Sequence, residues 1–282
     1  MKHLGVKPIV SALLLLVAWV IFLQPSAAAE LKIAAKAAVL MNAQTGKIIW
    51  AQNQQLRLLP ASTAKILTAL VVLDHSRTSD VVSIPAEALR VSGATTRLTA
   101  GEKLSVGDLL HAMLLGSGND AAIALALHTA ASIDNFVERM NHKAHDLGAV
   151  RSHFFNPTGM PHPEQLTTAQ DLALITQAAL ENSEFRKIVG TTTYRWKSRG
   201  WQGAIKNSNQ LLSSYDGAIG VKTGNTREAG YCLVAAAQRG GQTYIAVVLK
   251  SQEKAVWRDA RQLLDYAFKH RSLEAGHGSS VR

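Results

Sequence analysis

Strand-like patterns lie at the two ends of this chain and helix-like patterns lie between them, which limits the fold to few architectures. Residues 37–42 and 47–53 alternate between apolar and polar side chains around Gly46, which can adopt a positive φ, so a β-hairpin is predicted. Residues 81–190 show mainly helical spacing. Strand patterns then return at residues 191–196, 218–222, 230–238 and 243–250, with a Gly240-Gly241 turn before the last. One sheet built from both ends of the chain is therefore expected.

The helices that we expect have recognisable ends. Pro60 precedes a helical pattern at residues 62–74. Ser105 and Asp108 have the spacing of a capping box and begin a helix that runs to residue 115. Further helices are predicted at residues 120–131, 133–147, 168–180 and 255–270. The fold class is thus α/β of the α+β kind, an antiparallel β-sheet flanked by helices with an inserted helical subdomain.

The first 29 residues have the pattern of a signal peptide. Lys2 and Lys7 precede an apolar run that ends in Pro25 and three alanines, the small residues that a signal peptidase requires. An uncleaved membrane anchor is the alternative, because the run is close to the roughly 20 residues that span a bilayer. We expect an extracytoplasmic protein with one folded domain at residues 30–275 and a disordered tail at residues 276–282.

Composition narrows the classes of partner. The chain has 30 Lys and Arg against 20 Asp and Glu, a formal charge of +10. This excess suits the membrane or an anionic wall polymer, although a solvated surface explains it equally well. Nucleic acid is not expected, because the basic residues are scattered and the chain is exported. The single cysteine, Cys232, lies in an apolar segment and is interpreted as a buried structural thiol.

Ser62 and Lys65 place a hydroxyl and an amine three residues apart at the start of a predicted helix, so both lie on one face. A serine hydroxyl is a poor nucleophile until a base removes its proton. Lys65 can be that base if burial or a nearby cation lowers its pKa. Alone, the pair is weak evidence and would be interpreted as a solvated helix face.

Ser117 and Asn119 lie in the loop between two apolar helices, where a hydroxyl and an amide two residues apart can point at one spot. Ser117 could relay a proton between Lys65 and a leaving amine. Asn119 could hold a substrate carbonyl and contact Lys65. An ordinary turn with a helix cap is the alternative interpretation.

Lys222, Thr223 and Gly224 are predicted to end a strand that begins near residue 218. Lys222 supplies a cation, Thr223 a hydroxyl for a substrate carboxylate, and Gly224 lets a ligand approach the backbone. Alone, such a tripeptide is usually a strand that runs into a turn.

The three motifs occur together, in one order and each in a fitting context, and this trio is known from penicillin-binding proteins and related β-lactamases. The chain resembles the low-molecular-mass D-alanyl-D-alanine carboxypeptidases from residue 37 to about residue 269. Further segments with this resemblance are residues 60–68, 116–121, 155–159 and 222–226, the last leading to Ala229 and Gly230.

The resemblance implies that Ser62 attacks the carbonyl between two D-alanines of a peptidoglycan stem peptide, that the terminal D-alanine leaves, and that water hydrolyses the ester. It implies β-lactam antibiotics as inhibitors, no cofactor and no metal. The backbone N–H groups of Ser62 and Asn225 would form the oxyanion hole. Ser62, Lys65 and Ser117 are the expected catalytic residues. The expected substrate-binding residues are Asn119, Lys222, Thr223, Gly224 and Asn225.

The sequence departs from the family at several points. Many members carry a second, all-β domain and a C-terminal membrane-docking helix, and neither fits in this length, so membrane attachment through such a helix is not expected. A monomer is expected. Some members have His where this chain has Asn225, and an Arg near the position of Ser208. The partner of Thr223 in binding a carboxylate is therefore unassigned.

Three other functions were weighed. A β-lactamase needs a base for deacylation, and Glu164 is the candidate, although a surface role suits it better. A catalytically idle wall-binding protein or β-lactam sensor could share this scaffold, but a sensor is usually fused to a transmembrane signalling region. A metallopeptidase is not favoured, because no glutamate accompanies His142 and His145 in zinc-protease spacing.

Overall fold

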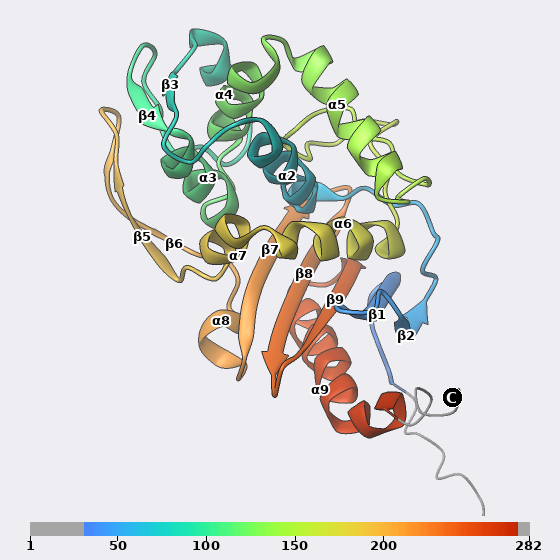
Figure 1. The fold of residues 1–282 in the computed structure, drawn as a ribbon. Coiled ribbons are helices and arrows are strands. Elements are labelled where there is room, and N and C mark those ends of the chain that lie inside the picture. The colour runs from blue at the N-terminus through green and yellow to red at the C-terminus, as the bar shows by residue number, and fades with distance from the viewer. Residues whose placement is uncertain (1–30, 276–282) are drawn as a thin grey trace, which may run out of the picture. The chain divides into compact units, whose positions relative to one another are not determined.

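The computed structural model describes residues 31–275, so the predicted signal segment and the predicted disordered tail lie outside the described residues. A five-stranded antiparallel sheet with the order β2-β1-β9-β8-β7 forms its centre (Figure 1). The strands are β1 (Ala37–Asn42), β2 (Ile48–Gln52), β7 (Ala218–Thr226), β8 (Gly230–Arg239) and β9 (Gln242–Ser251). The prediction of one sheet made from both ends of the chain is confirmed.

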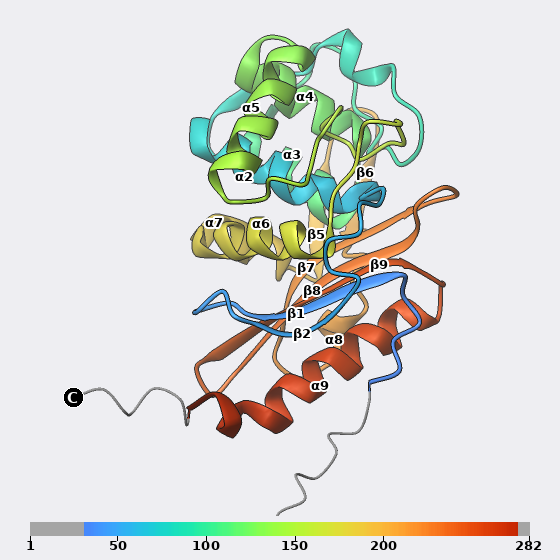
Figure 2. The ribbon, with the colours of Figure 1, turned by 90° about the vertical axis from the view of Figure 1, so that its right-hand side faces the viewer.

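Helices cover both faces of this sheet (Figure 2). Helix α9 (Ala255–Ala275) packs on one face against β8 and β9, and α6 (Ala169–Glu181) packs on the other against β1 and β9. All six residues of β1 are consequently buried. The Gly240-Gly241 turn between β8 and β9 is confirmed, with positive φ at both glycines as a two-residue hairpin loop requires.

All remaining elements are inserted between β2 and β7. They are η1 (Ala61–Ala64), α2 (Lys65–His75), β3 (Val81–Ser83), η2 (Ala86–Leu89), β4 (Lys103–Ser105), α3 (Val106–Leu115), α4 (Asn119–Ala130), α5 (Ile133–Asp146), α6, α7 (Ser183–Val189), β5 (Thr193–Lys197), β6 (Gln202–Lys206) and α8 (Leu211–Ser214). The predicted capping box of Ser105 and Asp108 is present at the start of α3. None of the helices within residues 31–275 is both long and apolar enough to cross a membrane.

Helix α2 is the centre of the insertion. It contacts α3, α4, α5, α6 and α7, and its first eight residues are all buried. A helix that is apolar all round is stable only in such a surrounding, because every face must leave water. Lys65, the first residue of α2, is therefore carried into the interior.

Three expectations about local structure are correct only in part. Ser62 lies in the 3-10 turn η1, and the α-helix begins only at Lys65. Lys222, Thr223 and Gly224 do not end a strand, because β7 continues to Thr226 and pairs with β8 across a short turn. The strand predicted at residues 191–196 is present as β5, but it pairs with β6 in a separate two-stranded sheet and does not join the central sheet.

Candidate active site

A cleft of about 780 Å³ lies where β7 meets the helical insertion. Six of the eight predicted site residues line it: Ser62, Ser117, Asn119, Thr223, Gly224 and Asn225. The other two, Lys65 and Lys222, are buried, with 0% and 1% of their surface exposed. The structure thus brings the three sequence motifs to one place.

The backbone at Ser62 is held between two glycines. A Cβ added to Gly159 would lie 1.9 Å from the carbonyl oxygen of Ala61, and one added to Gly224 would lie 2.9 Å from the amide nitrogen of Ser62. Both approaches are too close for any side chain, and Gly159 also has a φ of +84°. Gly224 therefore gives the backbone of η1, rather than a ligand alone, room to approach β7.

The amine of Lys65 lies among three oxygen atoms. Its Nζ is 3.1 Å from Ser62 Oγ, 2.7 Å from Asn119 Oδ1 and 2.5 Å from the carbonyl oxygen of Thr158. The last two oxygens are acceptors only, so they take two N–H groups. A neutral amine has two N–H groups and one lone pair. In that state its lone pair is available to the hydroxyl of Ser62.

The electrostatic surroundings favour the neutral state of Lys65. Burial lowers the pKa of Lys65 well below its ordinary value, and the nearby cation of Lys222 lowers it further. The carboxylate of Asp120 acts in the opposite direction. Asp120 is itself fixed by hydrogen bonds that it accepts from the backbone of Thr96 and Leu98. Lys65 thus has the properties of a general base.

Asn119 is oriented by its neighbours. Its backbone N–H donates to the carbonyl of Ala94, and its Nδ2 donates to the carbonyl of Ser92 at 2.6 Å. The amide oxygen of Asn119 then points at Lys65. These contacts decide which end of the side-chain amide is oxygen and which is nitrogen. Ser117 is partly exposed at the cleft with a φ of +62°, and no hydrogen bond joins its hydroxyl to another residue of the part described.

Lys222 and Thr223 point to opposite sides of β7, as successive strand residues do. Lys222 is buried, and this burial lowers its pKa to about 7. The hydroxyl of Thr223 faces the cleft and lies 2.6 Å from the hydroxyl of Ser208. Ser208 is the residue that the fold places beside Thr223. Only the tertiary fold brings it to Thr223, because 15 residues separate the two.

The sequence analysis also missed the carbonyl of Thr158 as a partner of Lys65. The loop that carries it is held by Asn156, whose Oδ1 accepts hydrogen bonds from the backbone N–H groups of Thr158 and Gly159. The segment 155–159 had been noted only as a family-like stretch. A backbone acceptor leaves no mark in a sequence, so only the asparagine and glycine of this loop could have indicated it.

Among the residues considered for other functions, Cys232 lines the cleft and the others lie outside it. Glu164 is exposed and does not line the cleft, and His142 and His145 are exposed on α5. No group of three metal-ligating side chains occurs among residues 31–275. Cys232 is buried as predicted, and this burial raises the pKa of its thiol to about 11, which makes it a poor nucleophile.

Comparisons with known proteins agree with this geometry. The family model described as D-alanyl-D-alanine carboxypeptidase matches residues 24–253. The chain is 36% identical over 246 residues to the D-alanyl-D-alanine carboxypeptidase DacF of Bacillus subtilis, covering 85% of this chain and 63% of the relative. It is 37% identical to the D-alanyl-D-alanine carboxypeptidase of a Streptomyces strain over 255 residues, covering 84% and 88% of the two chains.

The fold is shared with solved structures as well. The crystal structure of the Streptomyces DD-transpeptidase superposes with a TM-score of 0.81 at 36% identity, covering 85% of this chain and 99% of that one. The fold and the serine-lysine site therefore define a serine acyl-transfer hydrolase of the penicillin-binding class. The chain belongs to the D-alanyl-D-alanine carboxypeptidase family.

The influence of Lys222 on Lys65 gives a prediction about pH. The rate of Ser62 modification by penicillin should rise with pH as Lys65 loses its proton. Lys222→Gln removes a cation that lowers the pKa of Lys65, so this rise should move to higher pH. Lys222→Arg keeps a positive charge at every pH, so it should not move the rise to higher pH. A rise at the same pH in all three proteins would contradict the electrostatic coupling, whatever the absolute rates.

Proposed function

We propose that this protein is a penicillin-sensitive serine D-alanyl-D-alanine carboxypeptidase that removes the terminal D-alanine from peptidoglycan stem peptides. The observation that carries the proposal is the buried Lys65 amine, 3.1 Å from the hydroxyl of Ser62 at the edge of the cleft. Family membership supports it, although the chain spans only 63% of the length of DacF and 88% of the Streptomyces relative.

The acylation step follows from the positions of these two side chains. Lys65 takes the proton of Ser62 Oγ, and the oxygen attacks the carbonyl carbon of the peptide bond between the two D-alanines. The negative charge develops on the carbonyl oxygen, toward which the backbone N–H groups of Ser62 and Asn225 point in this proposal. Asn119, at the edge of the cleft, binds a carbonyl of the peptide backbone while it holds Lys65.

Release of D-alanine requires a proton on its nitrogen. Ser117 lines the cleft, its hydroxyl has no hydrogen bond to any other residue between 31 and 275, and it can pass the proton from Lys65 to the leaving amine. The acyl-enzyme at Ser62 then loses its ester bond to water, which Lys65 deprotonates as before. Lys65 passes the proton taken from water to Ser62 Oγ as the ester bond breaks. In each half of the reaction Lys65 thus takes one proton and gives it up, so the enzyme ends in its starting state.

The substrate carboxylate binds at Thr223 and Ser208 in this proposal. The two hydroxyls lie 2.6 Å apart on the cleft surface, and each can donate one hydrogen bond to a carboxylate oxygen. Lys222 lies behind them and contributes positive charge, and an approaching carboxylate favours its protonated form. This arrangement supports an enzyme that acts on a free C-terminus.

A family that acts on peptidoglycan works outside the cytoplasm, which supports an extracytoplasmic location. We assign the first 29 residues to a signal peptide and residues 30–275 to the catalytic domain. The enzyme acts as a monomer and needs neither cofactor nor metal. β-Lactamase activity is less well supported, because Glu164, the base considered for it, does not line the cleft.

Penicillin treatment followed by mass measurement tests the proposal. The intact protein should gain one penicilloyl group, and peptide mapping should place it on Ser62. Lys65→Arg should reduce the acylation rate by about 100-fold or more, because a guanidinium cannot accept a proton near neutral pH. Rapid release as penicilloic acid would instead identify a β-lactamase, and a label on another residue would refute the assignment of Ser62.

Binding of the substrate's C-terminal carboxylate by Thr223 is tested with two stem peptides, one with a free C-terminus and one with an amidated C-terminus. Thr223→Val should lower kcat/KM for the free acid by about 10-fold or more and for the amide only slightly, because the amide has no carboxylate to lose. The four kcat/KM values form a double-mutant cycle. Equal losses on both peptides would mean that Thr223 acts on backbone geometry instead.

A further inference from the structure

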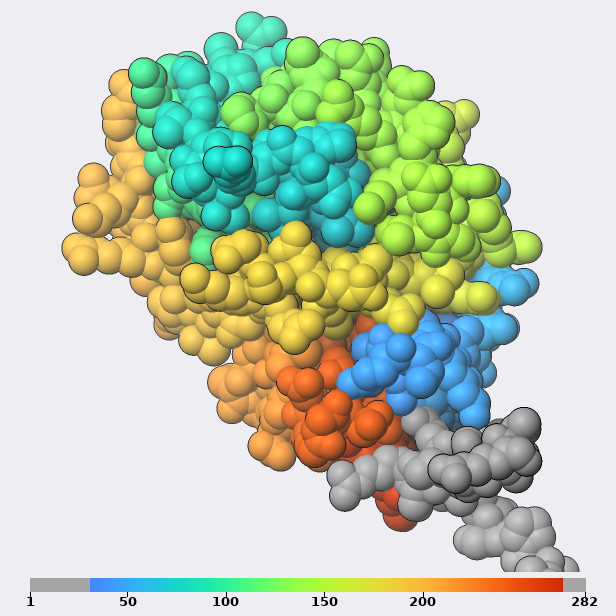
Figure 3. Space-filling view, in the orientation of Figure 1, coloured from blue at the N-terminus to red at the C-terminus, as the bar shows by residue number. Residues whose placement is uncertain are grey.

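One segment of the chain carries positive charge without any acidic residue. Between Glu184 and Asp216 there are six Lys and Arg residues and no Asp or Glu. The six are Arg186, Lys187, Arg195, Lys197, Arg199 and Lys206. Four of them belong to the hairpin β5–β6 and its tip, which lies along the edge of the molecule in Figure 3, coloured orange.

The two faces of this hairpin differ. Tyr194 and Trp196 face the insertion, where the Tyr194 hydroxyl donates to Asp108 at 2.5 Å and the Trp196 side chain is buried. Alternation along the strands then turns Arg195, Lys197 and Lys206 outward. All three are exposed, and none forms an ion pair with any residue of the described range 31–275.

The outward face continues into a groove of about 380 Å³ between the hairpin tip and β4. Lys103, Lys197 and Arg199 line this groove together with Gln202. Its one acidic residue, Glu102, is 5% exposed, so its carboxylate faces the protein rather than the groove. The groove therefore has a net positive charge.

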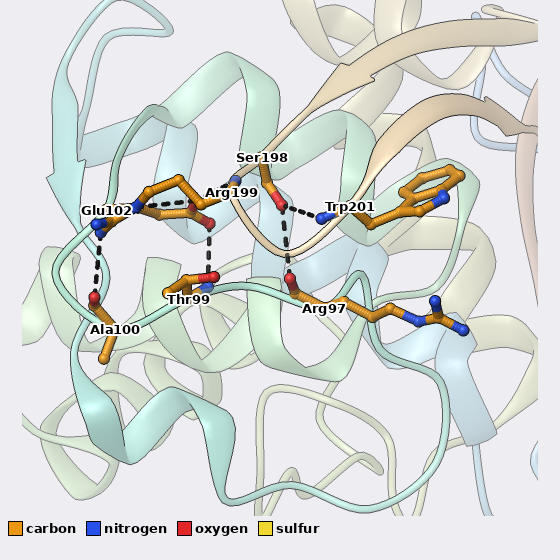
Figure 4. Close-up of polar contacts among 7 residues, drawn as sticks. All are labelled: Arg97, Thr99, Ala100, Glu102, Ser198, Arg199 and Trp201. Carbon is orange, nitrogen blue, oxygen red and sulfur yellow. Dashed lines mark hydrogen bonds and ion pairs between the residues drawn. The ribbon is translucent and has the colours of Figure 1, made fainter.

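Contacts within the protein occupy Glu102 (Figure 4). Its carboxylate accepts hydrogen bonds from the backbone N–H groups of Thr99 and Arg199, at 3.1 and 2.7 Å. The guanidinium of Arg199 lies 3.8 Å from the same carboxylate and donates to the carbonyl of Ala100. Glu102 thus fixes the hairpin tip and leaves the charges of Lys103 and Lys197 uncompensated.

We propose that the outward face of β5–β6 and the adjoining groove, named here the hairpin face, bind a linear phosphodiester polymer of the cell envelope. Arg195 and Lys197 are two residues apart on one strand, which spaces their charges by roughly 7 Å. Such a row matches a chain of regularly spaced anions. The proposal adds a partner to the proposed wall enzyme and rests on its extracytoplasmic location.

A polymer fits this surface better than a lipid bilayer does. The outward positions of the two strands that do not carry charge are Thr193, Gln202 and Ala204, and none of them has a large apolar side chain that could enter a membrane. A groove also suits a chain rather than a flat surface. Ser208 follows Lys206 by two residues and lines the catalytic cleft, so a bound polymer would lie close to the substrate site.

Binding of long-chain inorganic polyphosphate tests the hairpin face. The triple variant Arg195→Gln, Lys197→Gln and Lys206→Gln should bind at least 10-fold more weakly than the unmodified protein at physiological salt. Its affinity should also depend less steeply on salt. The slope of log K against log salt concentration should fall in magnitude by roughly 3, about one for each lost phosphate contact. The matched control is Lys36→Gln, Lys47→Gln and Arg57→Gln, which removes the same charge from exposed positions beside β1 and β2, at the other edge of the sheet.

Loss in the hairpin variant with little change in the control would support the proposal. Equal losses in both would overturn it, because net charge alone would explain binding. Absence of binding by the unmodified protein would also overturn it. So would stronger hairpin-dependent binding to phosphatidylglycerol vesicles than to polyphosphate, because that result identifies a membrane surface.

Penicillin acylation of the same proteins separates this proposal from the proposed function. The three substituted side chains lie outside the cleft, so the hairpin variant should acylate at the unmodified rate. Polyphosphate binding without acylation in the unmodified protein would refute the carboxypeptidase proposal while leaving the hairpin face supported. Acylation without hairpin-dependent binding would support the carboxypeptidase proposal and refute the proposal for the hairpin face.

Discussion

Burial of the Lys65 amine is the constraint on which the site depends. A protonated amine taken out of water loses its hydration, and the protein supplies only two carbonyl oxygens and a hydroxyl in return. The neutral amine is satisfied by the same three partners at a much smaller cost. Its position follows from α2, a helix whose apolar faces must all be covered by other helices. The packing of helices around α2 therefore also lowers the pKa of Lys65 and makes it a base.

The sheet and the insertion meet at Ser62, and two glycines make that contact close. Gly159 and Gly224 let a loop and β7 approach the backbone of η1 from different directions. β7 also carries Lys222 into the interior and Thr223 to the cleft surface, because successive strand residues face opposite ways. One strand thus supplies both a cation that acts on Lys65 and a hydroxyl for the substrate.

The sequence alone indicated much of this and missed parts for physical reasons. Three motifs in a fixed order predicted which side chains would meet, and the alternating patterns predicted the central sheet. The strand was predicted to end at Gly224. The glycine instead lies within β7, where the absence of a side chain lets the backbone of η1 pack closely against the strand. Contacts such as Ser208 with Thr223, or the carbonyl of Thr158 with Lys65, depend on tertiary packing or on backbone atoms, which no side-chain pattern records.

The central claim is that Lys65 is held as a neutral base, and direct titration of its amine tests this claim. Nuclear magnetic resonance of protein with labelled lysine side chains, assigned by comparison with Lys65→Arg, would follow the Lys65 signal with pH. The account predicts a transition well below the ordinary lysine pKa of about 10.4. A Lys65 transition near that ordinary value would contradict it, because the amine would then be charged at neutral pH and could not accept the proton of Ser62.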